Sequence, residues 1–91
     1  MWVGVINMNN KHKKTLEKLF QDPIKPLEWQ RIEKLLIALG AEVFEGKGSR
    51  VSFVLNDIPM TFHRPHPEKE VKKYQIKNVR EFLTVAGIDV K

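Results

Sequence analysis

The chain has 91 residues, of which 42% are hydrophobic, and it carries a formal net charge of +5. This length suits one small domain with a single core, and the hydrophobic content is too high for a chain that is disordered throughout. Because the sequence contains no cysteine, disulfide bonds and thiolate–metal sites are excluded.

Residues 1–10 are expected to form an N-terminal tail, followed by a single domain at residues 11–91. The apolar run at 1–8 is far too short to span a membrane, and it lacks the charged start and cleavage site of a signal peptide. We therefore expect a soluble protein of the cytoplasm with no membrane partner.

The first predicted element is a short extra helix within residues 12–21. Leu16, Leu19 and Phe20 recur at helical spacing there. The helix must end before Asp22-Pro23, because the residue before a proline disfavours the helical conformation.

A second, longer helix opens the predicted core at residues 27–90. A stiff proline-containing connector at 23–26 precedes it, and we expect the helix to begin at Pro26 or Leu27. Gly40 stands where a left-handed residue ends a helix. The apolar stripe of this helix comprises Trp29, Ile32, Leu35, Leu36 and Leu39. Because Trp29 belongs to this stripe, we expect it in the core and not as a platform for base stacking.

Alternating apolar residues next predict three antiparallel strands. The first covers residues 41–45, and Gly46-Lys47-Gly48 turns into a hairpin whose two-residue turn is Asn56-Asp57. This register pairs residues 51 with 62, 53 with 60 and 55 with 58 on one apolar face. It places Arg50 beside His63 on the opposite, solvated face.

Pro59 tests this arrangement because it cannot donate a hydrogen bond. Its missing N–H is harmless only if the third strand lies at the edge of the sheet. The expected order is therefore first, second, third.

A final helix closes the chain and completes the predicted fold. Its apolar stripe comprises Ile76, Val79, Phe82, Leu83 and Ala86, and Gly87 ends it. The order of elements predicts an α+β two-layer sandwich in which the helices cover the apolar face of the sheet.

Positive charge is concentrated in residues 63–80, where six basic and two acidic residues leave a net charge of +4. Such clustering favours a polyanionic partner, most often nucleic acid. The alternative is an ordinary solvated surface, because lysine is common on protein surfaces.

Four segments together resemble the HicA family, the toxins of HicA–HicB toxin–antitoxin pairs. They are LLIALGAEV (35–43), GKGSRVSFVL (46–55), MTFHRPHPEKE (60–70) and VREFLTVAGI (79–88), and HKKTLEKLF (12–20) is similar to an N-terminal extension of one branch. The resemblance implies a fold like the double-stranded-RNA-binding domain, ribonuclease activity on mRNA, no cofactor, and inhibition by a HicB-like antitoxin.

The chain departs from this family at one important position. The usual Gly-Ser-His element, whose histidine is regarded as catalytic, is Gly48-Ser49-Arg50 here. Arginine cannot serve as a proton-accepting base in a protein, so that role is not carried over.

The predicted site therefore moves the proton chemistry to histidine. His63 is the expected general base or acid, Arg50 the phosphate clamp, and His66 the second proton carrier. The expected RNA-binding residues are Lys47, Ser49, Arg64, Lys69, Lys72, Lys73 and Lys77. No metal is expected, because two histidines around a proline, without cysteine or an acidic cluster, are a poor ligand set.

Each of these residues also has an ordinary structural interpretation. His63 is also consistent with an ordinary exposed residue at a strand end, and His66 with a stiff exit loop. Arg50 is also consistent with an ion pair to Glu42 or Glu45. Two other functions therefore stay open beside the ribonuclease. One is an RNA- or partner-binding module that has lost its active site, and the other is a structural interaction domain whose charge serves solubility.

Overall fold

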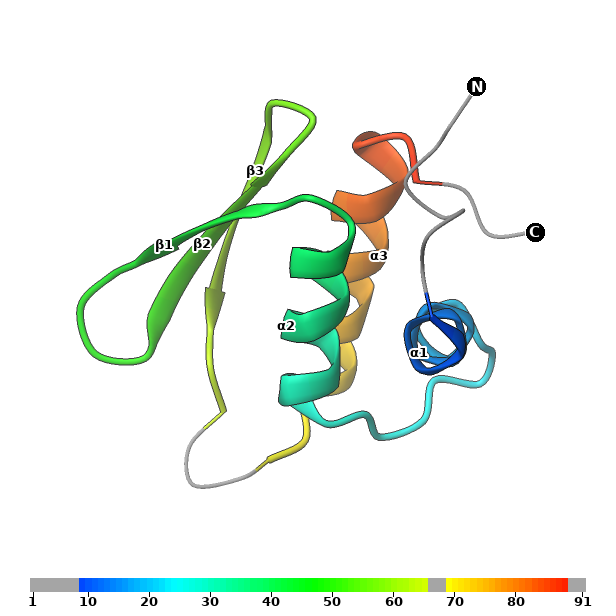
Figure 1. Cartoon of the computed structure of the whole chain (residues 1–91). Coiled ribbons are helices and arrows are strands. Elements are labelled where there is room, and N and C mark those ends of the chain that lie inside the picture. The colour runs from blue at the N-terminus through cyan, green and yellow to red at the C-terminus, as the bar shows by residue number, and fades with distance from the viewer. Residues whose placement is uncertain (1–8, 66–68, 89–91) are drawn as a thin grey trace.

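The computed structural model describes residues 9–65 and 69–88 as three helices and a three-stranded sheet. The elements follow in the order α1 (Asn10–Leu19), α2 (Trp29–Ala38), β1 (Glu42–Glu45), β2 (Arg50–Leu55), β3 (Ile58–His63) and α3 (Lys73–Val85). Helices α2 and α3 lie side by side against one face of the sheet, and α1 lies on the far side of this helix pair (Figure 1). This is the predicted α+β architecture with an extra N-terminal helix.

The sheet has the strand order and the register expected from the alternating pattern. Its order is β1-β2-β3, which leaves Pro59 on an edge strand, and Val51, Phe53 and Leu55 pair with Phe62, Met60 and Ile58. The turn residues Asn56 and Asp57 have φ angles of 51° and 67°, as a tight two-residue hairpin turn requires. The hairpin prediction is confirmed.

The core lies between the sheet and the helix pair. Every residue of the two predicted helical stripes is buried, with a relative exposure of 9% or less. Trp29 is buried as expected: its ring stacks on Phe62 at a centroid distance of 4.1 Å and meets Phe53 edge-on at 5.8 Å. These aromatic contacts hold α2 against the hairpin that carries the candidate site.

Both core helices end at glycine, as predicted. Gly40 and Gly87 have φ angles of 101° and 87°. The N–H groups of the following residues, Ala41 and Ile88, donate to the carbonyls of Leu36 and Leu83 at 3.0 and 2.9 Å. These bonds satisfy helix carbonyls that would otherwise lack partners.

The second helix begins at Trp29, so the predicted start at Pro26 or Leu27 is wrong. The residues before it are extended and pair with the segment before α3. The Trp29 N–H donates to the Lys69 carbonyl at 2.8 Å, and the Val71 N–H donates to the Leu27 carbonyl at 3.1 Å. The partners of this bridge are far away in the sequence, and pairing with them replaces the first helical turn.

The first helix is also placed differently, because a capping residue sets its start. The Asn9 side chain accepts the His12 N–H at 2.8 Å, so α1 already begins at Asn10. At the other end, the Arg80 guanidinium of α3 donates to the carbonyls of Leu19 and Gln21. It also pairs with Asp22 at 3.2 Å. Arg80 thus fastens the end of α1 to the rest of the domain.

Candidate functional site

Arg50 and His63 lie opposite each other at one end of the hairpin. They form the cross-strand pair at the start of β2 and the end of β3, and both are exposed. Directly opposed residues of an antiparallel pair project to the same face of the sheet. The predicted pairing of Arg50 with His63 on the solvated face is therefore confirmed, whereas the chemical roles of the two residues stay predictions.

The backbone at Gly46 lies close to the aliphatic part of the Arg50 side chain. A Cβ atom added at Gly46 would lie 3.2 Å from the Arg50 Cβ and 3.3 Å from its Cδ. The Gly46 N–H also donates to the Arg50 carbonyl at 2.9 Å. Glycine at position 46 thus leaves room for the arginine stem beside the loop.

His63 is held from the other side by the first turn of α3. The buried Gln75 side chain donates from Nε2 to the His63 carbonyl at 3.1 Å, and its Oε1 accepts the Lys72 N–H at 3.0 Å. Both ends of one amide are therefore used to join the end of β3 to the start of α3. The sequence pattern did not single out Gln75. The available signal was a glutamine among the buried positions of a helix, where this residue type is unusual.

The next residue along the chain, Arg64, has quite different surroundings. Its guanidinium donates to the Glu45 carboxylate at 2.8 and 2.9 Å and to Glu33 at 2.8 Å. We call Glu33, Arg64 and Glu45 the arginine latch, because they connect α2, β1 and the exit of β3. Hydrogen bonds from Arg64 lower the pKa of the Glu45 carboxyl below its ordinary value of 4.5.

The arginine latch bears on two expectations from the sequence: an ion pair between Arg50 and Glu45, and RNA binding by Arg64. Glu45 pairs with Arg64, and among the described residues no carboxylate pairs with Arg50. Arg64 was expected to bind RNA, but its donors are already directed at two carboxylates. Its role in RNA binding stays a prediction that the observed contacts do not favour.

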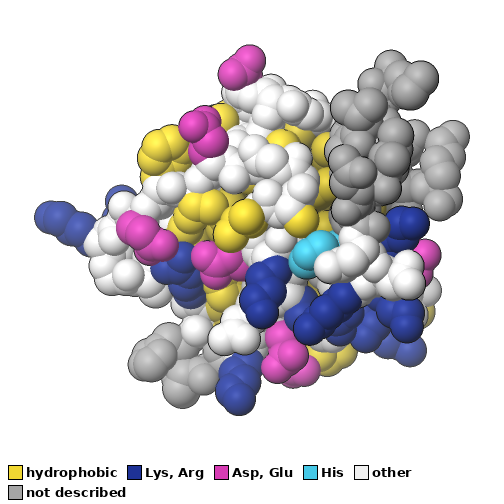
Figure 2. Space-filling view, viewed as in Figure 1, with side chains coloured by type: hydrophobic (Ala, Val, Ile, Leu, Met, Phe, Trp, Pro, Cys, Tyr) yellow, Lys and Arg dark blue, Asp and Glu magenta, His cyan; other side chains and the backbone are white. Residues whose placement is uncertain are grey.

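The other expected RNA-binding residues fall into two groups. Lys47 and Ser49 are exposed in the loop that leads into Arg50, so they lie next to the exposed pair. Lys72 precedes α3, and Lys73 and Lys77 lie one turn apart on its exposed surface. Figure 2 shows Lys and Arg side chains gathered in the lower half of one face of the molecule, with acidic side chains among them.

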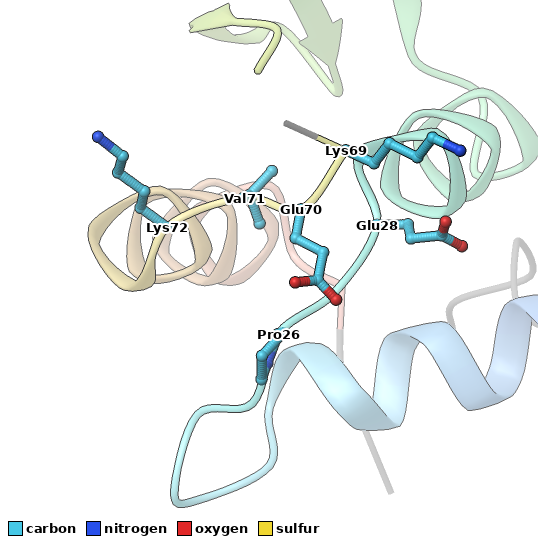
Figure 3. A pocket seen from close by; sticks show the side chains of 6 residues that line it. All are labelled: Pro26, Glu28, Lys69, Glu70, Val71 and Lys72. Carbon is cyan, nitrogen blue, oxygen red and sulfur yellow. The ribbon is translucent and has the colours of Figure 1, made fainter. Parts of the chain in front are cut away.

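Lys69 lies in a more mixed environment than the other lysines. It lines an open groove of about 520 Å³ at the bridge between the connector and the segment before α3, together with Glu28, Glu70 and Lys72. Figure 3 shows Lys69 and Glu28 pointing to one side of this groove and Lys72 to the other. The two carboxylates oppose a phosphate there, so Lys69 is the weakest candidate of the set.

The remaining candidate, His66, lies outside the described residues, so its predicted role as a second proton carrier is untested. The sequence pattern also gave no sign of Tyr74, which is 61% exposed at the start of α3.

Within residues 9–65 and 69–88, no group of three histidine, cysteine or acidic residues is arranged to hold a metal ion. No helix in the same part of the chain is long and apolar enough to cross a bilayer.

These features define a small α+β domain whose exposed sheet face carries the paired residues Arg50 and His63. The family model described as the HicA toxin of bacterial toxin–antitoxin systems matches residues 29–88, well over half of the chain. The chain therefore belongs to the HicA family of toxins, and a cognate antitoxin partner follows from this membership. Searches of curated proteins and of solved structures returned no match.

Proposed function

We propose that this HicA-family chain is an endoribonuclease that cleaves messenger RNA and is blocked by a HicB-like antitoxin. The observation that supports this most is the cross-strand pairing of Arg50 with His63 on the exposed sheet face. The pair brings a proton carrier and a phosphate-binding cation together where an RNA strand has free access.

In the proposed reaction, His63 takes the proton of a ribose 2′-hydroxyl. The 2′-oxygen then forms a bond to the neighbouring phosphorus, and the bond from phosphorus to the 5′-oxygen breaks. Histidine suits this task because its pKa lies near the operating pH, and general base catalysis of this kind contributes roughly 10²- to 10⁴-fold.

Arg50 stabilises the additional negative charge on the phosphate oxygens during this step. Its planar guanidinium offers two parallel N–H donors to two oxygens, which a lysine ammonium does not. Glycine at position 46 leaves room for the aliphatic part of the Arg50 side chain beside the loop.

The leaving 5′-oxygen takes up one proton, so the products are a 2′,3′-cyclic phosphate and a 5′-hydroxyl. His66 is the predicted donor of that proton. The reaction then uses two histidines and one arginine and consumes no cofactor.

The proposed antitoxin covers the face that carries Arg50 and His63. An inhibitor with acidic side chains complements the basic residues there, which speeds association and blocks RNA at the same time. The expected partner is a small acidic HicB-like protein.

One specific observation favours a second function, namely Arg50 in place of the family's histidine. In this case the chain binds RNA or its partner but has lost the ability to cleave. Arg50→His distinguishes the two functions, because it restores the family's Gly-Ser-His element at an exposed position. If the active site has been lost, the unaltered chain is inactive and Arg50→His gains cleavage.

The direct test compares the purified chain with His63→Ala on a fluorescent RNA. We expect His63→Ala to lower the cleavage rate by about 100-fold or more and to abolish growth arrest when the toxin is produced without antitoxin. His12→Ala is the matched control, because His12 lies on α1, on the far side of the helices from the sheet (Figure 1). Unchanged cleavage by His63→Ala contradicts the mechanism.

A further inference from the structure

A small hollow lies beside His63 where β3 meets the start of α3. Its volume is about 180 Å³, and its lining includes His63, Glu70, Lys72 and Tyr74. This is well below the roughly 300–1,000 Å³ of a pocket that encloses a drug-sized ligand. The hollow therefore suits one flat group of a larger ligand.

The folding of the domain does not explain the position of Tyr74. The residue is the second of α3, lies outside the buried stripe of that helix and is 61% exposed. An exposed aromatic ring beside lysines and a histidine is typical of surfaces on which nucleobases stack.

The charges around the hollow favour a base over a phosphate. Arg64 also lines it, but its guanidinium is taken up by the arginine latch. Glu70 also lines the hollow, and its negative charge opposes an anion at this position. Lys72 is then left for the phosphate that follows that base.

We propose that Tyr74 is the stacking platform for one unpaired nucleobase of the RNA that lies across Arg50 and His63. This inference rests on the proposed function and makes it more specific, because it names single-stranded RNA as the substrate. A base inside a duplex is stacked on both faces and paired along its edge, so it cannot enter the hollow. The double-stranded-RNA-binding type of fold would by itself suggest the opposite preference.

The test measures binding of a fully 2′-O-methylated RNA, which lacks the attacking hydroxyl, as a single strand and as a blunt duplex. We expect Tyr74→Ala to weaken single-strand binding by about 5- to 150-fold, which corresponds to the loss of one stacked base. Tyr74→Phe should stay within about 2-fold of the unaltered chain, because it keeps the ring. Tyr74→Leu keeps an apolar side chain without the ring and should resemble Tyr74→Ala.

A fluorescent base analogue in the RNA provides a second readout that a purely structural role would not change. The unaltered chain and Tyr74→Phe should quench 2-aminopurine at the bound position, whereas Tyr74→Ala and Tyr74→Leu should not. Val85→Ala is the matched control, because Val85 is similarly exposed (59%) near the other end of α3.

The outcomes separate this inference from the proposed function. Cleavage that depends on His63 but is indifferent to Tyr74→Ala overturns the inference alone. Equal weakening on single strand and duplex, or weakening confined to antitoxin binding, overturns it as well. If the unaltered chain binds neither the single-stranded RNA nor the duplex, both proposals are overturned.

Discussion

His63 and Arg64 are consecutive in the chain, but their side chains point to opposite faces and have different surroundings. His63 faces solvent beside Arg50, whereas Arg64 is 28% exposed and is bound by the carboxylates of Glu33 and Glu45. The contrast follows from the period of a strand, in which successive side chains point to opposite faces. The arginines of this chain therefore differ in their roles. Arg64 and Arg80 hold parts of the fold together, whereas Arg50 is available to a ligand.

Replacing each arginine in turn tests this difference between Arg50 and Arg64 most directly. We expect Arg50→Ala to lower the cleavage rate by about 100-fold, as the loss of one donor to a developing negative charge does. Arg50→Lys should recover part of that rate, since it keeps the charge but not the paired donors. Initial rates on a fluorescent RNA measure both effects.

Arg64→Ala is the matched control for this experiment. It removes the same charge from the opposite face, and it should change the cleavage rate by less than about 10-fold while lowering the melting temperature. Equal falls in rate for Arg50→Ala and Arg64→Ala would contradict the division into a ligand-binding and a structural arginine.

A second prediction extends the comparison to the lysines. A chain in which Lys72, Lys73 and Lys77 are all replaced by Gln should bind single-stranded RNA more weakly and with less dependence on salt. For every phosphate that the variant no longer neutralises, the slope of log K against log salt concentration should become shallower by about 0.7. Binding measured from about 50 to 200 mM salt gives this slope.

The control for this variant removes the same number of charges elsewhere. Lys11, Lys13 and Lys14 are exposed on α1, on the far side of the helices from the sheet (Figure 1). Gln and Lys have similar helix propensities, so neither triple variant should unfold its helix. A similar change of slope in both would show that overall charge, and not the surface of α3, attracts the RNA.

The hairpin and the helical stripes could be predicted from the sequence because their signals are local. Alternation over residues 51–62 and the turn at Asn56-Asp57 determine the register, and the register places Arg50 beside His63. The apolar spacing of α3 likewise determines which of its residues are buried.

What the sequence did not predict depends on contacts between distant residues. The start of α2 is set by the bridge between Glu28 and Glu70. The surroundings of Arg64 are set by the carboxylates at positions 33 and 45. The hollow beside His63 likewise needs α3 to pack next to the end of β3. None of these partners is specified by a local pattern.

The smallest predicted effect concerns the pH dependence of the arginine latch. Because hydrogen bonds from Arg64 lower the pKa of Glu45 below 4.5 in the folded chain, the unfolded chain binds a proton at a higher pH than the folded chain does. The stabilisation by Glu45 should therefore be complete well above pH 4.5 and be lost as the pH falls through the lowered pKa of the folded state.

Glu45→Gln removes this dependence, so its melting temperature should lie slightly below that of the unaltered chain at neutral pH and converge with it in acid. The effect is small because the Glu45 side chain is 65% exposed and salt and water screen the pair. Glu42→Gln takes the same charge from the same strand, outside the latch, and should run parallel to the unaltered chain at every pH. If Glu42→Gln converged in acid in the same way, the pH dependence would report the charge of β1 as a whole and not the bond to Arg64.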